Sequence, residues 1–286
     1  MASGSYDAVL TLFNRPHMLA RQIESLVKQT AKPNRIFLLV NGVSSLDHAL
    51  IRQASRGIEI VVINSSSNLG VWGRFWVGSW SNADFLLVLD DDTLPGERWA
   101  EKCLYEEKQQ LCVIGARGLR FRSDNSYFPF DEFGWAAPNY DKKKVDILGH
   151  SWFFPRYLAA DMFRLDVDRE DKFLTSGEDI CLCLLAEKQS IPCFVLPHRE
   201  GAYGEWGSDP AVGKSEGESA SAISASTDSA RKFDDALRYF RVVLGVDLAA
   251  YAGRRSLTLM EKIVYNSGLL RKFFRAYKKL RNSKWK

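Results

Sequence analysis

Strand-like and helix-like segments alternate along the first third of this chain. The strand-like segments are short apolar runs at residues 7–13, 36–40, 58–63 and 85–89. Between them, apolar residues recur at helical spacing in residues 17–30, and further helices are expected near 45–56 and 72–81. This alternation predicts an α/β fold, in which helices cover both faces of a mostly parallel sheet.

The polar turns that follow the four strands are expected to lie together. Parallel strands bring the loops at their carboxyl ends to one edge of the sheet, and α/β proteins bind ligands at that edge. Four turns would meet there: Phe13–Arg15, Asn41–Gly42, Asn68–Gly70 and Asp90–Asp92. The sequence therefore predicts a pocket of nucleotide size at this edge.

Three consecutive carboxylates, Asp90, Asp91 and Asp92, directly follow the fourth strand. Like charges this close raise one another's pKa unless a cation is present. Mg²⁺ or Mn²⁺ would relieve the repulsion and would also bridge the phosphates of a bound nucleotide. The alternative is a solvated turn that caps the helix expected to begin near Glu97, because Asp is common at turns and N-caps.

Five short stretches carry a resemblance to a known family: residues 11–16, 25–30, 68–70 and 87–95, and the Gly177–Asp179 sequence. Together they resemble the inverting GT-A glycosyltransferases, particularly family 2, over roughly residues 7–200. The resemblance implies a Rossmann-like GT-A domain at 1–206, with a nucleotide-sugar half at about 1–112 and an acceptor half at about 113–206. It also implies metal-dependent transfer of a sugar from a nucleotide diphosphate-sugar, UDP in first place, to a glycan or lipid-linked saccharide hydroxyl.

The resemblance also assigns residues to the donor. It places Asp90 near the ribose and Asp92 on the metal, with Asp91 between them. Many family members carry an acid near the nucleobase where this chain has Asn41, whose amide can bond a uracil or thymine edge. Arg74 is either a diphosphate contact or a surface arginine. Five further residues of these turns complete the expected donor-binding set: Phe13, Asn14, Arg15, Asn68 and Gly70.

Inverting transfer needs a base that removes the proton from the acceptor hydroxyl. The resemblance assigns this role to Asp179, with Glu178 holding the acceptor or orienting a neighbour. The alternative is that both acids only stabilise the first turn of the helix predicted at 178–189.

A histidine and two tryptophans are further candidates. Related GT-A enzymes often supply a third metal contact from a histidine after a late strand, which implies His198 beside Asp92 as a ligand of Mn²⁺ or Mg²⁺. The alternative for His198 is an unliganded loop residue. Trp152 and Trp206 are expected on the acceptor side, where rings pack on sugar faces, although aromatic residues more often belong to the core.

The C-terminal part has a different composition. Residues 207–230 are rich in Ser, Ala and Gly and are predicted to be a flexible loop or linker. Residues 231–286 are expected to form a basic helical extension, and 253–286 hold 11 Lys and Arg against one acid, Glu261. An amphipathic basic helix within 256–286 is typical of an anchor on an anionic membrane surface. The alternative is a helix packed on the domain. We expect no nucleic-acid partner, because no nucleic-acid-binding motif accompanies the basic residues.

Several features bound the location and the function class. There is no run of 18 uncharged apolar residues and no signal-like N-terminus, which predicts a cytoplasmic protein, at most peripheral on the inner face of a membrane. The five cysteines are expected to be buried and reduced. Two other functions stay open: a sugar nucleotidyltransferase, although the Gly-rich loop typical of that class is missing after the first strand, and a catalytically degenerate glycan-binding protein.

Overall fold

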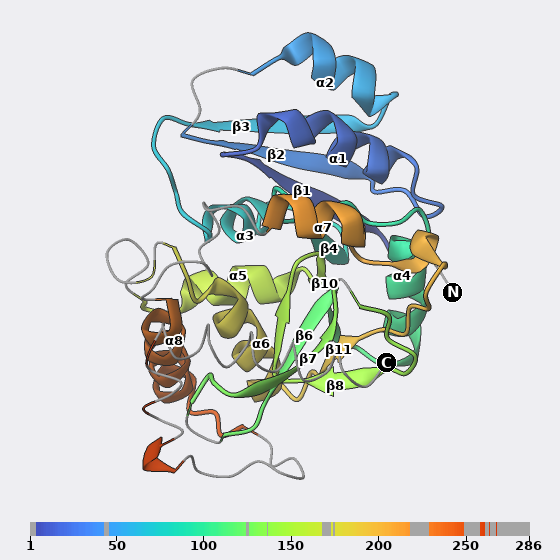
Figure 1. Ribbon diagram of the computed structural model, residues 1–286. Coiled ribbons are helices and arrows are strands. Elements are labelled where there is room, and N and C mark those ends of the chain that lie inside the picture. Colours follow the sequence, from blue (N-terminus) through green and yellow to red (C-terminus); the bar gives the residue numbers. More distant parts are fainter. Residues whose placement is uncertain are drawn as a thin grey trace.

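The structure is a computed structural model that describes residues 4–42, 46–123, 126–135, 137–167, 173, 175–217, 229–248, 258–260, 263 and 267 (Figure 1). Its main element is an eight-stranded sheet with the strand order β3-β2-β1-β4-β10-β5-β11-β8. The first four strands run parallel to one another: β1 (Tyr6–Leu12), β2 (Arg35–Asn41), β3 (Glu59–Ser65) and β4 (Phe85–Val88). They confirm the four predicted strands to within two residues at each end.

Beyond β4 the sheet becomes mixed. Strand β10 (Trp152–Pro155) lies antiparallel between β4 and β5 (Val113–Ile114), and β11 (Cys193–Val195) runs parallel to β5. Strand β8 (Lys143–Val145) closes the edge antiparallel to β11. A second, antiparallel sheet has the order β7-β6-β9, from β7 (Phe130–Gly134), β6 (Arg117–Phe121) and β9 (Ile147–Gly149).

Helices cover both faces of the large sheet, so all seven residues of β1 are buried. Side chains alternate between the faces of a strand. Leu10 packs in a cluster with α1 (Leu19–Val27), α2 (His48–Ser55) and α4 (Trp99–Gln109). Its neighbour Val9 packs in a cluster with α3 (Gly73–Gly78), α5 (Tyr157–Arg164), α6 (Glu178–Lys188) and α8 (Ser229–Leu244). This arrangement confirms the predicted α/β class of GT-A, Rossmann-like type.

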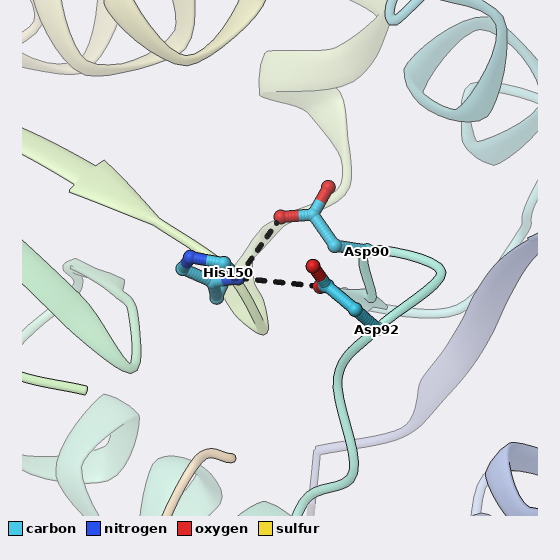
Figure 2. Close-up of side chains that lie close together, drawn as sticks. All are labelled: Asp90, Asp92 and His150. Carbon is cyan, nitrogen blue, oxygen red and sulfur yellow. Dashed lines mark ion pairs between the residues drawn. The ribbon is translucent and has the colours of Figure 1, made fainter. Parts of the chain in front are cut away.

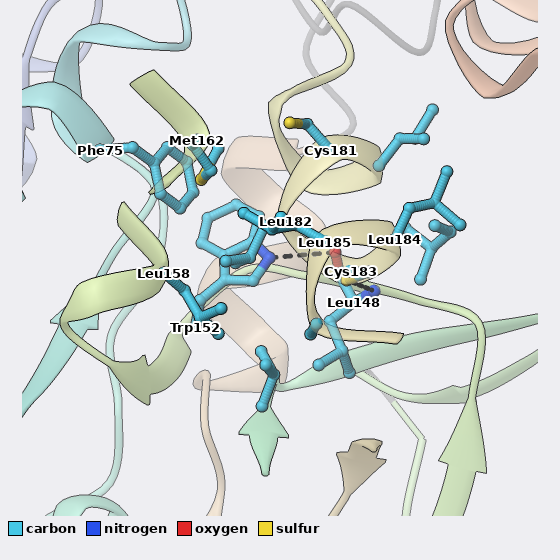
Figure 3. Packing of buried hydrophobic residues seen from close by; sticks show 14 of the residues in the cluster. Phe75, Leu148, Trp152, Leu158, Met162, Cys181, Leu182, Cys183, Leu184 and Leu185 are labelled. Atoms are coloured by element: carbon cyan, nitrogen blue, oxygen red, sulfur yellow. Dashed lines mark hydrogen bonds between the residues drawn. The ribbon is translucent and has the colours of Figure 1, made fainter. Parts of the chain in front are cut away.

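Helix α6 carries no polar face, because it is surrounded by protein. Its contacts include β9, α5 and α8, and its residues from Ile180 to Ala186 are all buried. Figure 3 shows its leucines packed with Phe75, Leu158 and Trp152. All five cysteines are free and buried, as the sequence indicated.

Helix α8 belongs to this core, where the sequence predicted the start of a separate extension. Ala236, Leu237 and Phe240 are buried, and the Phe240 ring lies 5.9 Å from Trp72 of the loop before α3. Figure 1 shows α8 beside α6. The apolar face of α8 therefore packs on α6, and the division of the chain at residue 231 stays a prediction.

The predicted loop at 207–230 begins with an ordered helix, α7 (Pro210–Gly217). Two short 3-10 helices, η1 (Pro16–Met18) and η2 (Tyr203–Glu205), complete the described elements. Residues 218–228 of that loop, and nearly all of the predicted anchor at 256–286, lie outside the described residues. Within the described part of the chain, no helix is long and apolar enough to cross a membrane.

Candidate active site

The site begins at the loop that follows β4. Asp90 and Asp91 are partly exposed, and Asp92 is buried. The loop is held from α1 by Gln22, whose buried Nε2 donates to the carbonyl oxygens of Asp90 at 2.7 Å and Thr93 at 3.1 Å. These hydrogen bonds hold the three carboxylates at the carboxyl end of β4, the edge of the sheet where the sequence predicted the pocket.

His150 lies against two of these carboxylates (Figure 2). Its Nδ1 is 3.3 Å from Oδ2 of Asp90 and 3.6 Å from Oδ1 of Asp92. Burial acts to raise the pKa of Asp92, but the contact with His150 and the charge of Arg15 outweigh burial and lower it. Because its pKa is lowered, Asp92 is ionised at neutral pH, as a carboxylate ligand of a metal must be.

The same three residues form a donor set that suits a divalent cation. One ligand atom from each of Asp90, Asp92 and His150 lies within 4.8 Å of the others. Carboxylate oxygens suit both Mg²⁺ and Mn²⁺, and imidazole nitrogen shifts the preference toward Mn²⁺. The residues present thus fit the ion implied by the Asp triplet.

Arg74 connects this cluster to the second half of the chain. Its Nη1 lies 2.8 Å from Oδ1 of Asp90, and its Nη2 lies 2.8 Å from Oε1 of Glu178. Its guanidinium is also 5.0 Å from the ring centre of Trp152. Burial acts to lower the pKa of Arg74, but Asp90 and Glu178 raise it above its ordinary value. Arg74 is therefore an internal cation of the site, and the alternative of a surface arginine is wrong.

Glu178 and Asp179 open α6 after Gly177, which adopts a left-handed conformation at φ 93°. A β-carbon at Gly177 would meet the Phe240 ring at 3.0 Å, so glycine suits both the backbone and the space. Burial, followed by the charge of Asp179, raises the pKa of Glu178 to about 8. Burial raises the pKa of Asp179 to about 6, although the Ile180 N–H donates to its carboxylate at 2.7 Å.

Because of these two pKa shifts, the two carboxyl groups differ in protonation at neutral pH. Glu178 holds a proton while Asp179 is ionised, because the first pKa lies above 7 and the second below it. Neighbouring carboxyl groups with separated pKa values are typical of acid–base sites. Of the two groups, Asp179 is the one whose pKa leaves it able to accept a proton at neutral pH.

Arg15 is the second cation at the triplet. It forms an ion pair with Asp91 and lies 3.7 Å from Oδ2 of Asp92. Burial raises the pKa of Asp91, which the charge of Arg15 partly offsets. Arg15 also donates to the carbonyl oxygen of Glu216 at 3.0 Å, so it ties α7 to the triplet. No pattern in the sequence predicted Glu216 beside the triplet.

The other expected donor residues form the rim of the site. Phe13 and Asn14 are exposed in the loop after β1. Asn41 is buried, and its side chain shapes the next loop: Nδ2 donates to Oδ1 of Asn68 at 2.9 Å, and Oδ1 accepts from Leu69 N–H at 2.7 Å. Gly70 turns that loop at φ 65°. Asn41 therefore supports the loop, and its amide is engaged there rather than turned to a nucleobase.

Three expectations are corrected by burial. His198 is outside the carboxylate cluster: its Nδ1 lies 2.9 Å from the Leu196 carbonyl oxygen and its Nε2 lies 3.1 Å from that of Ala137. Burial also lowers its pKa. Trp206 packs on His198 with 3% of its surface exposed. Trp152 is 2% exposed and packs in the core (Figure 3). The Arg74 guanidinium lies over its ring. None of the three is placed to contact a metal or an acceptor.

Sequence reasoning did not place His150, Trp135 or Arg117 at the carboxylate cluster. The Trp135 ring stacks on His150, with ring centres 5.4 Å apart and an angle of 12° between the planes. Arg117 lies 5.7 Å from the ring centre of Trp135. The signal in the sequence was a histidine directly after the strand Ile147–Gly149. A single histidine in a loop is too common to identify a metal ligand.

Comparisons with known proteins agree with this geometry. The sequence model of the family described as "Glycosyl transferase family 2" matches residues 7–167, more than half of the chain. Among curated protein sequences, none matches significantly.

Solved structures of Staphylococcus aureus TarS share the fold. TarS residues 1–349 match with a TM-score of 0.54 at 14% identity, over 87% of this chain and 68% of that one. The same fragment in complex with UDP matches with a TM-score of 0.50 at 13% identity, over 68% of this chain and 58% of that one. A longer TarS structure gives 0.55 at 14% identity, and this chain spans only 41% of its length.

Proposed function

The chain belongs to glycosyl transferase family 2, and on this premise we propose that it transfers a sugar from a nucleotide diphosphate-sugar to a hydroxyl group of a glycan or a lipid-linked saccharide. The observation that carries the proposal is that the buried Arg74 joins Asp90 of the triplet to Glu178, the residue directly before Asp179. UDP is the favoured nucleotide, which the UDP complex of a TarS fragment of similar fold supports.

The proposed reaction is a single displacement with inversion. Asp179 accepts the proton of the acceptor hydroxyl while the hydroxyl oxygen attacks the anomeric carbon of the donor. The bond from that carbon to the diphosphate oxygen breaks, and the nucleoside diphosphate leaves with the electron pair. Arg15 and Arg74 are the described cations beside the triplet and would face the charge that develops on the leaving group.

Asp92 and His150, with Asp90, are the residues that would hold Mn²⁺ or Mg²⁺. When bound, such an ion supplies positive charge at the donor diphosphate. The cluster can accommodate that charge, because the acidic side chains of Asp90, Asp91, Asp92 and Asp179 outnumber the guanidinium groups of Arg15 and Arg74 that contact the triplet.

A thermal-shift screen tests the donor, the metal and the site together. We expect a UDP-sugar with Mn²⁺ to raise Tm, and either component alone to raise it less. Slow, metal-dependent hydrolysis of the same UDP-sugar should accompany binding. A chain that binds glycans but neither binds nor hydrolyses any nucleotide-sugar would instead be the degenerate glycan-binding protein.

We also propose that residues 256–286 bring the enzyme to an anionic membrane surface. The support is the excess of basic residues in 253–286 together with their apolar spacing. Co-sedimentation with vesicles that contain phosphatidylglycerol tests this, with a chain truncated after residue 252 as the matched control. Equal binding of both chains would contradict the anchor and would leave the transferase proposal untouched.

A further inference from the structure

The small antiparallel sheet places one stack of planar side chains beside the carboxylate cluster. Arg117 of β6 is paired with Gly134 of β7 on one side and with Gly149 of β9 on the other. The residues that follow these two glycines are Trp135 and His150. The register of three strands therefore brings the two rings to the same end of the sheet, next to Arg117.

Both ring-bearing residues have an unusual backbone. Trp135 has a φ of 59° and His150 a φ of 54°, in the left-handed region that L side chains rarely adopt. The turn at Trp135 is fixed by its N–H, which donates to the Ala116 carbonyl oxygen at 2.7 Å. A β-carbon at Gly134 would meet that same oxygen at 2.4 Å, so the turn also requires glycine there. Strain of this kind persists where the surroundings hold a functional geometry.

The stack ends at the proposed metal ligand. The Trp135 and His150 rings are nearly parallel, at 12°, and their centres are 5.4 Å apart. In this orientation Nδ1 of His150 faces Asp90 and Asp92, at 3.3 and 3.6 Å. At the other end, Arg117 approaches the Trp135 ring and its Nε donates to Glu132 at 2.6 Å. Groups that orient a ligating histidine set the metal affinity of a site.

We propose that Trp135 is a positioning residue that holds the His150 ring for metal binding. The inference rests on the proposed function, because it assumes that Asp90, Asp92 and His150 bind the divalent ion. Trp135 acts through His150 and contacts neither carboxylate. It stabilises the ring orientation in which Nδ1 faces the cluster, and Arg117 stabilises the position of the indole in turn.

Titration of the full-length protein with Mn²⁺ alone, followed by the electron paramagnetic resonance signal of the free ion, tests this proposal without any nucleotide. We expect Trp135→Ala to weaken Mn²⁺ binding about tenfold, and Trp135→Phe, which keeps an aromatic face, to stay within about threefold of wild type. His150→Ala should weaken binding, and adding Trp135→Ala to it should weaken binding no further. Saturating Mn²⁺ should restore kcat in Trp135→Ala but not in His150→Ala.

Controls separate positioning from folding. Trp80→Ala removes a tryptophan that is 51% exposed and packs on Trp76 elsewhere, and it should leave Mn²⁺ binding unchanged. If Trp135→Ala fails to fold, Trp135→Leu keeps most of the volume without the ring and gives the same comparison. Additive losses in the double variant, or wild-type binding by Trp135→Ala, would overturn the proposal.

The inference and the proposed function fail in different ways. Unchanged Mn²⁺ binding in His150→Ala would overturn the positioning role, while turnover of a UDP-sugar by the same protein would uphold the transferase. The reverse result, the expected Mn²⁺ pattern without any use of a nucleotide-sugar, would overturn the transferase and uphold the role of Trp135.

Discussion

Arg74 of α3 donates a hydrogen bond to the buried Glu178 of α6, with 2.8 Å between Nη2 and Oε1. The pair joins the expected donor half of the chain to the helix that begins with the proposed base. Because Arg74 also contacts Asp90, one guanidinium sets the distance between the carboxylate triplet and the first turn of α6. This is the contact through which the two halves of the site are held in one geometry.

Arg74→Ala is expected to lower the free energy of unfolding by about 3 kcal/mol, because Asp90 loses its cation and the buried Glu178 loses its hydrogen-bond donor. Urea denaturation followed by circular dichroism measures this loss. The matched control is Arg98→Ala, which removes an arginine that is 53% exposed in its pairs with Glu101 and Glu205. That change should cost less than about 1 kcal/mol. Equal losses in the two variants would show that Arg74 does not act as an internal cation.

Asp179→Asn should reduce kcat for sugar transfer by about 10²–10⁴-fold, the usual contribution of a general base. The Kd for UDP with Mn²⁺, measured by calorimetry, should change little, since Asp179 is not among the residues that hold the donor. Glu178→Gln is the isosteric control, and it should retain more activity because Glu178 is protonated at neutral pH. The role of base would be refuted by an Asp179→Asn enzyme within tenfold of wild type.

The pH profile should report Asp179 directly. Its pKa is raised to about 6, chiefly by burial, and only the ionised form accepts a proton. The rate kcat/KM should therefore be level above about pH 6 and fall about tenfold per pH unit below it. The residual activity of Asp179→Asn should lack this acidic limb. A limb near pH 4 would mean that Asp179 titrates as an ordinary exposed carboxyl group.

The sequence predicted the parallel half of the fold because its strands are apolar runs that end in polar turns and alternate with helix-like segments. The strands β1–β4 were located in this way, and with them Asp90–Asp92. The resemblance, and not the periodicity, assigned their roles.

The second half was harder because its elements give almost no pattern. Strands of two to five residues, such as β5 and β9, are too short for periodicity. His150 was therefore not placed at the triplet, and the resemblance pointed to His198 as the metal ligand instead. Only the pairing of β9 with β6, and of β10 with β4, brings His150 to the triplet. The burial of Trp152 and Trp206 likewise depends on long-range packing.

The place of α8 in the fold depends on a buried carboxylate. Oδ1 of Asp234 accepts hydrogen bonds from the Tyr127 N–H at 2.6 Å and from the Ser126 hydroxyl at 3.1 Å. Only 6% of Asp234 is exposed, and burial raises its pKa. The Phe233 ring stacks on Tyr127 with ring centres 5.0 Å apart. Helix α8 is thus fixed to the segment before β7 as well as to α6.

Asp234→Ala is expected to lower the free energy of unfolding by about 1–3 kcal/mol, because the buried Tyr127 N–H loses its partner. Differential scanning calorimetry should show one transition, shifted by about 2–4 °C for each kcal/mol. Asp235→Ala is the matched control: its carboxylate is exposed and lies 3.9 Å from Arg231 one turn earlier, so its loss should cost less than about 0.5 kcal/mol. A separate early transition in Asp234→Ala, with the main transition unmoved, would mean that α8 unfolds independently and that the extension begins before it.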